Sequence, residues 1–166
     1  MALAEMDLGT NSIVWDIGAG SGSVAVEASQ IASGGQVYAV EMDAEDFALI
    51  GENAERFGAR NVFPVLGRAP EAWEGLPDPD AIFVGGTGRL IKQIVKEAFG
   101  RLRTGGRLVA CVGSPDNLCA VMDTLKQEGG DANCWMIQVS RGIPQLVDIR
   151  FESMNPIYLI SVTREA

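Results

Sequence analysis

The chain has 166 residues, of which 47% are hydrophobic and 21% are charged, proportions typical of one globular domain and not of a disordered chain. Its net charge of −9 argues against binding to a nucleic-acid backbone, which requires clustered lysine and arginine. The chain contains no histidine, and this excludes histidine-based zinc sites, serine–histidine–aspartate triads and histidine general bases.

The N-terminal residues and the cysteines predict a cytoplasmic protein. Residues 1–10 carry two acidic residues and no basic one, so they do not resemble a signal or transit peptide. No apolar run of about 18 residues is present, so we expect no membrane-spanning helix. Cys111, Cys119 and Cys134 are odd in number and form no C-x-x-C pair. We expect reduced, mostly buried thiols and no metal site.

Strand and helix patterns alternate along most of the chain. Apolar runs predict strands over residues 12–17, 36–41, 61–66, 80–84 and 107–112. Apolar residues at helical spacing predict helices over residues 22–32, 44–57, 89–102 and 114–128, and a short helical turn over residues 70–73. Such alternation is typical of a parallel sheet with helices on both faces.

The alternation ends after the fifth strand. Residues 132–140 and 157–163 both have strand patterns, and no helical pattern separates them. Consecutive strands without a crossover helix must pair antiparallel. We therefore predict an α/β fold with one doubly wound, Rossmann-like sheet that has one reversed strand, in a single domain over residues 1–166.

The first predicted strand runs directly into a glycine-rich turn, Asp16-Ile17-Gly18-Ala19-Gly20-Ser21-Gly22. Glycine lacks a Cβ atom, so such a turn can be tight and can present backbone N–H groups to a ligand. The spacing is G-x-G-x-G, whereas dinucleotide-binding proteins use G-x-G-x-x-G. A structural turn without a ligand is the alternative. Glu41 ends the next strand, where its two oxygens suit a pair of ribose hydroxyls.

The pattern D-x-G-x-G-x-G over residues 16–22 resembles motif I of the S-adenosylmethionine-dependent methyltransferases. The resemblance implies a class I, seven-stranded sheet of order 3-2-1-4-5-7-6 with strand 7 antiparallel, and S-adenosylmethionine as cofactor. It implies cofactor contacts from the loops after the first three strands: Asp16, Gly18, Ala19, Gly20, Ser21, Gly22, Glu41, Met42, Arg68 and Ala69. Many of these enzymes place an acid at position 68 to meet the adenine amine. Arg68 departs from this pattern, so the backbone of Ala69 is the expected contact.

Further stretches are similar to one family within this class. They are Gly67-Arg68-Ala69-Pro70-Glu71, Val84-Gly85-Gly86-Thr87-Gly88, Ser140-Arg141-Gly142 and Asn155-Pro156-Ile157-Tyr158. They resemble the decarboxylating precorrin-6B C15-methyltransferases of cobalamin synthesis, which form the smaller half of a bifunctional C5,C15 enzyme. The resemblance implies methylation of C15 of the corrin precursor, removal of the C12 acetate carboxylate, S-adenosylhomocysteine as product and assembly as a homotetramer. A C5-methyltransferase domain is then a candidate partner.

The same resemblance implies a substrate side but assigns no catalytic residue. Gly85, Gly86, Thr87 and Gly88 are expected to line the macrocycle. Arg89 and Arg141 are candidates for binding its carboxylates, because an acidic protein needs local cations to hold a polyanion. The alternative for each arginine is a solvated surface charge.

Several alternatives stay open. The stretch at residues 155–158 is also similar to the N-P-P-Y motif of amino-methyltransferases, but that motif follows the fourth strand, so we interpret it as a turn. Family members carry a lid segment before the first strand; we expect it to be missing or replaced here, with weak turnover. The rival functions are methylation of RNA or protein, and a catalytically silent cofactor-binding subunit.

Overall fold

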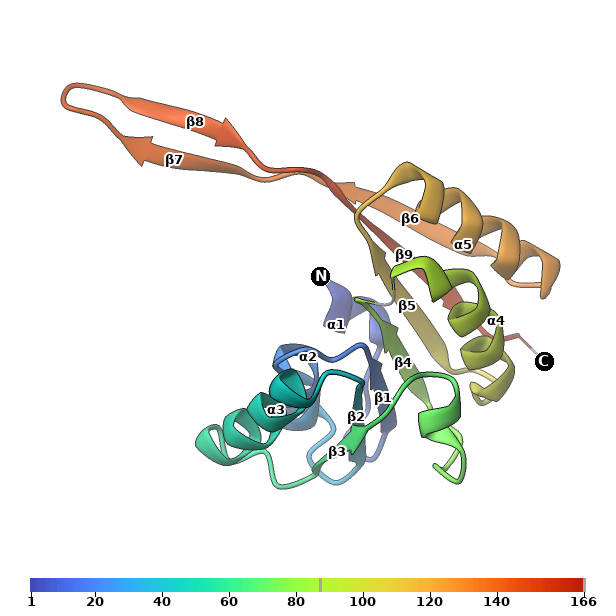
Figure 1. Ribbon diagram of the computed structural model, residues 1–166. Coiled ribbons are helices and arrows are strands. Elements are labelled where there is room, and N and C mark those ends of the chain that lie inside the picture. The colour runs from blue at the N-terminus through green and yellow to red at the C-terminus, as the bar shows by residue number, and fades with distance from the viewer. Residues whose placement is uncertain (87, 166) are drawn as a thin grey trace.

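The computed structural model describes residues 1–86 and 88–165, and its centre is a seven-stranded sheet of order β3-β2-β1-β4-β5-β9-β6 (Figure 1). Its strands are β1 (Ile13–Ile17), β2 (Gln36–Glu41), β3 (Val62–Leu66), β4 (Ala81–Val84), β5 (Arg107–Val112), β6 (Ala132–Ile137) and β9 (Ile157–Thr163). Strand β9 runs antiparallel to both of its neighbours, and the other pairs are parallel. This confirms the predicted order, with β9 in the place of the seventh strand.

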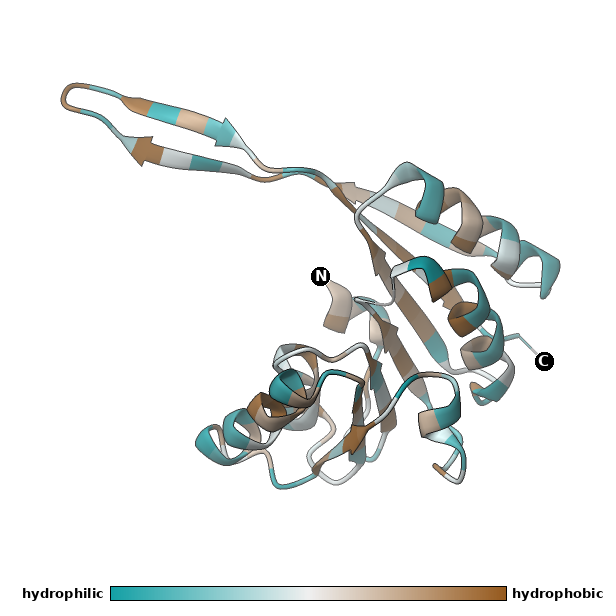
Figure 2. Ribbon diagram, viewed as in Figure 1, coloured by the Kyte–Doolittle hydropathy of each residue, from teal (hydrophilic) through white to brown (hydrophobic). Residues whose placement is uncertain are grey.

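Helices cover both faces of the sheet. They are α1 (Ala2–Met6), α2 (Ser23–Ile31), α3 (Ala44–Arg56), α4 (Ile91–Arg101) and α5 (Pro115–Gln127), with 3-10 turns η1 (Glu71–Trp73) and η2 (Gly88–Leu90). One buried cluster joins α1, α2 and α3 to residues such as Val14, and the other joins α4 and α5 to residues such as Trp15. Successive residues of β1 thus point into opposite cores, which is why β4 is apolar along its length and most residues of β1 and β5 are apolar (Figure 2).

Helix starts follow local chemistry that the sequence displays. The Asp43 side chain accepts from the backbone N–H groups of Glu45 and Asp46 and caps α3. Ser114 caps α5 by accepting from the N–H of Asn117. Helix α1 was not predicted, because five residues are too few to show a helical period. It packs on the sheet through Met6, which is 1% exposed.

The segment between β6 and β9 differs from the prediction. Residues 132–140 do not form one strand, because β6 ends at Ile137. Strands β7 (Ser140–Pro144) and β8 (Ile149–Ser153) pair antiparallel in a separate two-stranded sheet. Residues 138–156, here named the arm, project away from the body (Figure 1). Every residue of β8 is exposed.

The arm has two chemically different faces. Across the β7–β8 register, Gly142 pairs with Phe151 and Pro144 pairs with Ile149, which places these four residues on one apolar face. The side chains of Ile149 and Phe151 lie close over Gly142. The opposite face carries Arg141, Ile143, Arg150 and Glu152. The apolar face is therefore uncovered by the described chain, since Phe151 is 68% exposed.

Two further observations concern the thiols and membrane insertion. Cys119 and Cys134 are exposed and Cys111 is half-buried, so the prediction of mostly buried thiols is wrong. Cys119 is exposed on α5, and Cys134 is exposed on the edge strand β6. Among the described residues, none of the helices has the length and apolar character to cross a membrane.

Candidate functional site

The glycine-rich turn after β1 adopts backbone conformations that suit glycine. Gly18, Gly20 and Gly22 have φ values of 72°, 54° and 80°. A Cβ atom on Gly18 would lie 2.0 Å from the carbonyl oxygen of Gly85, so Gly18 is required for the packing of this turn against the loop after β4. A Cβ atom on Gly20 would meet nothing within 4 Å. The surface above Gly20 is therefore open for the approach of a ligand.

Glu41, at the end of β2, binds three backbone N–H groups. Its Oε2 accepts from Gly20 at 2.8 Å, and its Oε1 accepts from Met42 at 2.8 Å and Asp43 at 2.9 Å. The carboxylate thus joins the glycine-rich turn to the turn before α3. Because each carboxylate oxygen has two acceptor positions, Oε2 retains one for a ligand hydroxyl and Oε1 retains none. The expected contact with two ribose hydroxyls would therefore have to share Oε2 or displace a backbone donor.

Asp16 lies below the same turn and is 1% exposed. Its Oδ2 accepts from the N–H of Ala25 at 2.9 Å, in the first turn of α2. Its Oδ1 is buried and has no hydrogen-bond partner within residues 1–86 and 88–165. Burial raises the pKa of Asp16 from 3.8 to about 7; the Ala25 N–H opposes the rise, and the charge of Glu41 adds to it. A buried oxygen without a donor is costly, so Asp16 favours a ligand group that is cationic or donates a hydrogen bond.

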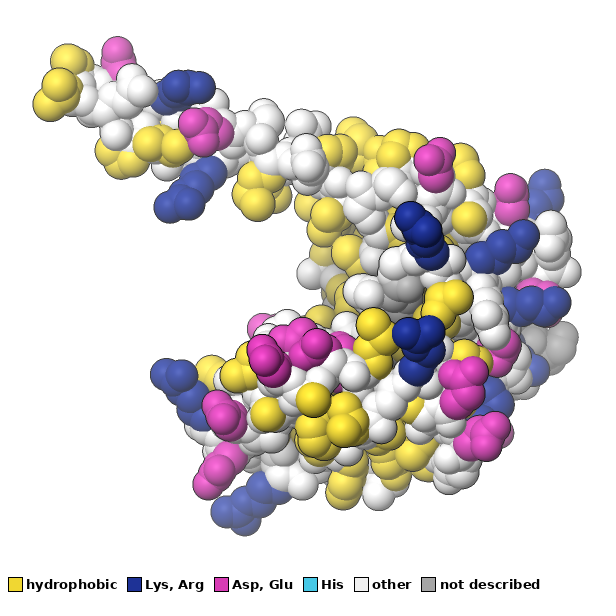
Figure 3. Space-filling view, in the orientation of Figure 1, with side chains coloured by type: hydrophobic (Ala, Val, Ile, Leu, Met, Phe, Trp, Pro, Cys, Tyr) yellow, Lys and Arg dark blue, Asp and Glu magenta, His cyan; other side chains and the backbone are white. Residues whose placement is uncertain are grey.

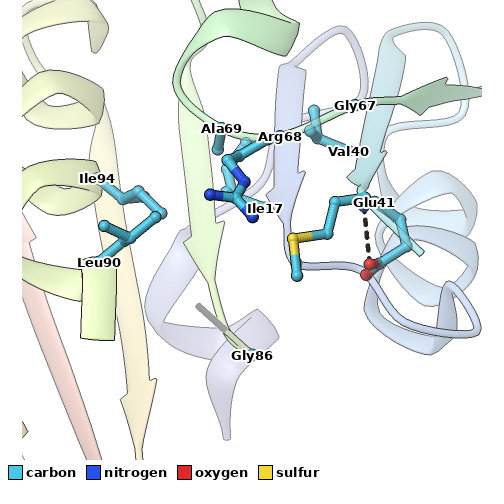
Figure 4. A pocket seen from close by; sticks show the side chains of 11 residues that line it. Ile17, Val40, Glu41, Gly67, Arg68, Ala69, Gly86, Leu90 and Ile94 are labelled. Atoms are coloured by element: carbon cyan, nitrogen blue, oxygen red, sulfur yellow. Dashed lines mark hydrogen bonds between the residues drawn. The ribbon is translucent and has the colours of Figure 1, made fainter. Parts of the chain in front are cut away.

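These loops enclose a cavity of about 290 Å³ at the carboxyl ends of β1, β2, β3 and β4 (Figure 4). Gly18 and Glu41 form its polar end. Its apolar wall consists of Ile17, Val40, Ala69, Leu90 and Ile94. The backbone of the loop after β3 is held in place, because the N–H of Gly67 donates to the carbonyl of Glu41 at 2.9 Å. Ligands of open α/β sheets bind at this edge.

The structure brings most of the predicted cofactor residues together. Five of them line the cavity: Gly18, Glu41, Met42, Arg68 and Ala69. The others lie within or below the glycine-rich turn: Asp16, Ala19, Gly20, Ser21 and Gly22. The carbonyl of Ser21 accepts from Asn53 Nδ2 at 2.9 Å, so α3 also holds this turn.

The predicted substrate residues are spread more widely. Gly86 lines the cavity, and Gly85 is buried behind it against Gly18. Gly88 and Arg89 are exposed in η2. Arg141 lies in β7 on the arm and does not line the cavity. Thr87 lies outside the described residues.

Sequence reasoning missed the apolar wall of the cavity. Leu90 ends η2 and is the N-cap of α4, Ile94 lies near the start of α4, and Val40 lies near the end of β2. Their residue types are the same as those of the core, so composition could not distinguish them. Their position was the available signal, because residues at the carboxyl ends of adjacent parallel strands and at the starts of the following helices meet at one edge.

Comparison with known proteins identifies the family. The family model described as a precorrin methyltransferase domain matches residues 1–164. A Pyrobaculum calidifontis protein named probable cobalt-precorrin-6B C(15)-methyltransferase (decarboxylating) is 38% identical over 163 residues, which cover 97% of this chain and 83% of that protein. A Salmonella typhimurium protein named cobalt-precorrin-6B C(15)-methyltransferase (decarboxylating) is 32% identical over 166 residues, covering 99% of this chain and 85% of that protein.

A solved structure supports the same assignment. The structure named precorrin-6y C5,15-methyltransferase from Geobacter metallireducens superposes with a TM-score of 0.91 at 33% identity, and the match covers 98% of this chain and 86% of that one. These comparisons confirm the family and the fold that the glycine-rich motifs predicted. The chain belongs to the precorrin methyltransferase domain family.

Proposed function

We propose that this chain transfers a methyl group from S-adenosylmethionine to C15 of precorrin-6B, or of its cobalt form, and removes the C12 acetate carboxylate, as a step of cobalamin biosynthesis. The observation that carries the proposal is the cavity at the carboxyl edge of the sheet. The chain around it aligns over 97% of its length with the Pyrobaculum calidifontis protein named probable cobalt-precorrin-6B C(15)-methyltransferase (decarboxylating). The cofactor supplies an electrophilic methyl group, and S-adenosylhomocysteine is its product.

The residues present fit this cofactor. The unpartnered Oδ1 of Asp16 suits the ammonium group of the methionine part, because a cation offsets the cost of the buried charge. The free acceptor position on Glu41 Oε2 suits a ribose hydroxyl. The open surface above Gly20 admits the chain that connects them. The apolar wall formed with Val40, Ala69 and Ile94 suits the base.

The protein itself contributes orientation and exclusion of water. Among the residues that line the cavity, Glu41 is the one carboxylate, and both of its oxygens already accept from backbone N–H groups. No catalytic acid or base is therefore assigned. During the reaction C15 gains the methyl group, and the electron pair of the broken bond to the carboxylate stays in the conjugated ring. Positioning of the two reactants can account for a large part of such a rate.

Arg89 and the arm are the candidate holders of the macrocycle carboxylates. Arg89 is exposed beside Leu90, which lines the cavity. The arm leaves the sheet at the same edge, because its two connections join Ile137 and Ile157, next to the carboxyl end of β5. Figure 3 shows a broad hollow between the arm and the body. Arg141 lies on the arm, so it would reach a substrate in this hollow only if an arm were held across it. That arm could belong to the same chain or to a neighbouring copy.

The arm also supports the proposal of a homo-oligomer, and of the tetramer that the family resemblance implies. An isolated two-stranded hairpin is marginally stable in water, so its apolar face requires a cover. At its tip, Leu146 is 106% and Val147 is 92% exposed. Because every copy presents the same surface, pairing of arms would give a closed, symmetric assembly. A C5-methyltransferase domain is the other candidate partner.

The test is turnover with precorrin-6B and S-adenosylmethionine, with mass spectrometry of the product. The expected product has gained one methyl group and lost one carboxylate, and CO₂ appears in equal amount. Bulk RNA and protein serve as competing acceptors. Methyl transfer to either of them with none to precorrin-6B would contradict the proposal. Binding of S-adenosylhomocysteine without any transfer would favour the silent subunit.

A further inference from the structure

The apolar part of the cavity contains one charged side chain, that of Arg68. Its neighbours there, Val40, Ala69, Leu90 and Ile94, have hydrocarbon side chains. The carboxylate of Glu41 lies at the other end and is bound to backbone N–H groups. In Figure 4 the guanidinium of Arg68 lies on the Ile17 and Ala69 side of the cavity, away from Glu41. A base that occupies the apolar part would therefore meet Arg68.

The backbone of Arg68 is fixed while its side chain is available. The carbonyl of Arg68 accepts from the N–H of Ala72 at 2.9 Å, and the preceding Gly67 is bound to Glu41. The Arg68 side chain is exposed, and it forms no ion pair within the described part of the chain. The guanidinium can therefore turn toward a ligand without breaking a contact in the free protein.

The chemistry of a guanidinium restricts what it can recognise. It is planar, keeps its charge and has hydrogen-bond donors but no acceptor. It can stack on the face of a purine ring or donate to a ring nitrogen. It cannot accept a hydrogen bond from the exocyclic amine of adenine, and the apolar side chains around it cannot do so either. An aspartate at this position would recognise the amine and not the ring nitrogens.

We propose that Arg68 holds the purine ring of the cofactor, by stacking and by donation to ring nitrogens, and that neither a side chain nor a backbone carbonyl of this site recognises the exocyclic amine. This inference rests on the proposed function, because it assumes an adenosine cofactor. Its consequence is that the site binds an S-adenosylhomocysteine analogue lacking the 6-amino group nearly as well as it binds S-adenosylhomocysteine itself.

Calorimetric binding of two ligands to the purified full chain tests this. The ligands are S-adenosylhomocysteine and its analogue with hydrogen at purine position 6, which keeps every ring acceptor nitrogen. The wild type should bind both ligands with affinities within about threefold, because nothing in the site accepts a hydrogen bond from the amine. If a charged acceptor did so, removal of the amine would weaken binding by about tenfold or more. Arg68→Met keeps the length of the side chain and removes its cation and donors, so both ligands should weaken by a similar factor of about three to ten.

Arg68→Asp supplies the acceptor that the wild type lacks. This variant should prefer S-adenosylhomocysteine over the analogue by about tenfold. Arg60→Met is the matched control, because Arg60 is exposed, lies before β3 and does not line the cavity; it should change neither affinity. The melting temperature of each variant shows that a lost affinity is not lost folding.

The possible failures are distinguishable. A tenfold loss of wild-type affinity on removal of the amine would overturn the inference, and would mean that a backbone carbonyl recognises the amine. Unchanged affinity in Arg68→Met would also overturn it, and would place Arg68 with the substrate. Absence of any S-adenosylhomocysteine binding by the wild type would overturn the proposed function itself, and the inference with it.

Discussion

Replacement of Asp16 by asparagine should stabilise the free protein at neutral and higher pH. Burial raises the pKa of Asp16 from 3.8 to about 7, so the folded protein resists ionisation of a group that ionises freely when unfolded. At about 1.36 kcal/mol for each pKa unit, this rise corresponds to about 4 kcal/mol. The asparagine oxygen can still accept from the Ala25 N–H, but its amide N–H groups would lack partners. We therefore expect a net gain of about 1 to 3 kcal/mol.

The pH dependence gives this prediction its sign. Well below pH 3.8 the carboxyl of Asp16 is protonated in both states, so its ionisation takes nothing from the stability. Between 3.8 and about 7 the unfolded chain releases the proton first, so the stability of the wild type falls as the pH rises; above about 7 the loss is constant. Urea denaturation at intervals from pH 4.5 to 8.5 measures the difference between the two proteins. The difference in unfolding free energy should be small at pH 4.5 and largest above pH 7.

Cofactor binding should change in the opposite direction. The ionised Asp16 would pair with the ligand ammonium, so wild-type affinity for S-adenosylhomocysteine should rise as the pH rises through about 7. Asp16→Asn should bind about tenfold or more weakly and lose this pH dependence. Equal unfolding free energies for the two proteins at pH 8 would refute the account of the buried charge. An unchanged affinity would refute its assignment to the cofactor.

Three further predictions concern the turn, the strand end and the arm. Gly18→Ala should lower the unfolding free energy by several kcal/mol, because the new Cβ would overlap the loop after β4. Gly20→Ala should lower it by about 1 to 2 kcal/mol, from backbone strain alone. Similar denaturation midpoints for the two variants would contradict this. In Glu41→Gln, the glutamine cannot accept from all three backbone N–H groups, so calorimetry should show affinity for S-adenosylhomocysteine reduced by about tenfold. An unchanged affinity would exclude binding of the ribose by Glu41. Leu146→Asp should reduce the mass measured by light scattering at micromolar concentration, while the neighbouring Gln145→Asp should not; monomeric wild type would contradict assembly through the arm.

The sequence predicts the geometry of the candidate site where its residues follow a local pattern. The apolar run of β1, the glycines after it and the carboxylate at the end of β2 are all visible in the sequence, and the fold brings them together at one edge. The predicted bounds of β2, β5 and β9 agree with the structure, because each strand is bordered by turn residues and buried over most of its length. The close packing of the backbone at Gly18 against Gly85 could not be predicted, because the only sign of it in the sequence is that these residues are glycines.

The arm was missed in the sequence, although residues 149–152 alternate apolar and charged side chains as its two faces require. Its strands are largely exposed, so neither is marked by the long apolar run that predicts the strands of the main sheet. Gly142 and Pro144 are also residue types that disfavour strands. The apolar face of the arm is not covered by the described chain, so no contact within one domain marks its residues in the sequence. The same limit applies to Arg141, which sequence reasoning placed near the substrate.

The charges near the site differ in depth, which suits the cofactor and the anionic macrocycle of the proposed function. The carboxylate of Glu41 lies at the polar end of the cavity and that of Asp16 lies beneath the glycine-rich turn, and both are at most 9% exposed. Arg89, next to the cavity residue Leu90, is exposed. The buried carboxylates favour the ammonium and sulfonium of the proposed cofactor, and the exposed arginine offsets the net charge of −9 where a polycarboxylate must approach. Because the carboxylates are buried and the arginine is solvated, salt should weaken binding of the macrocycle much more than binding of the cofactor.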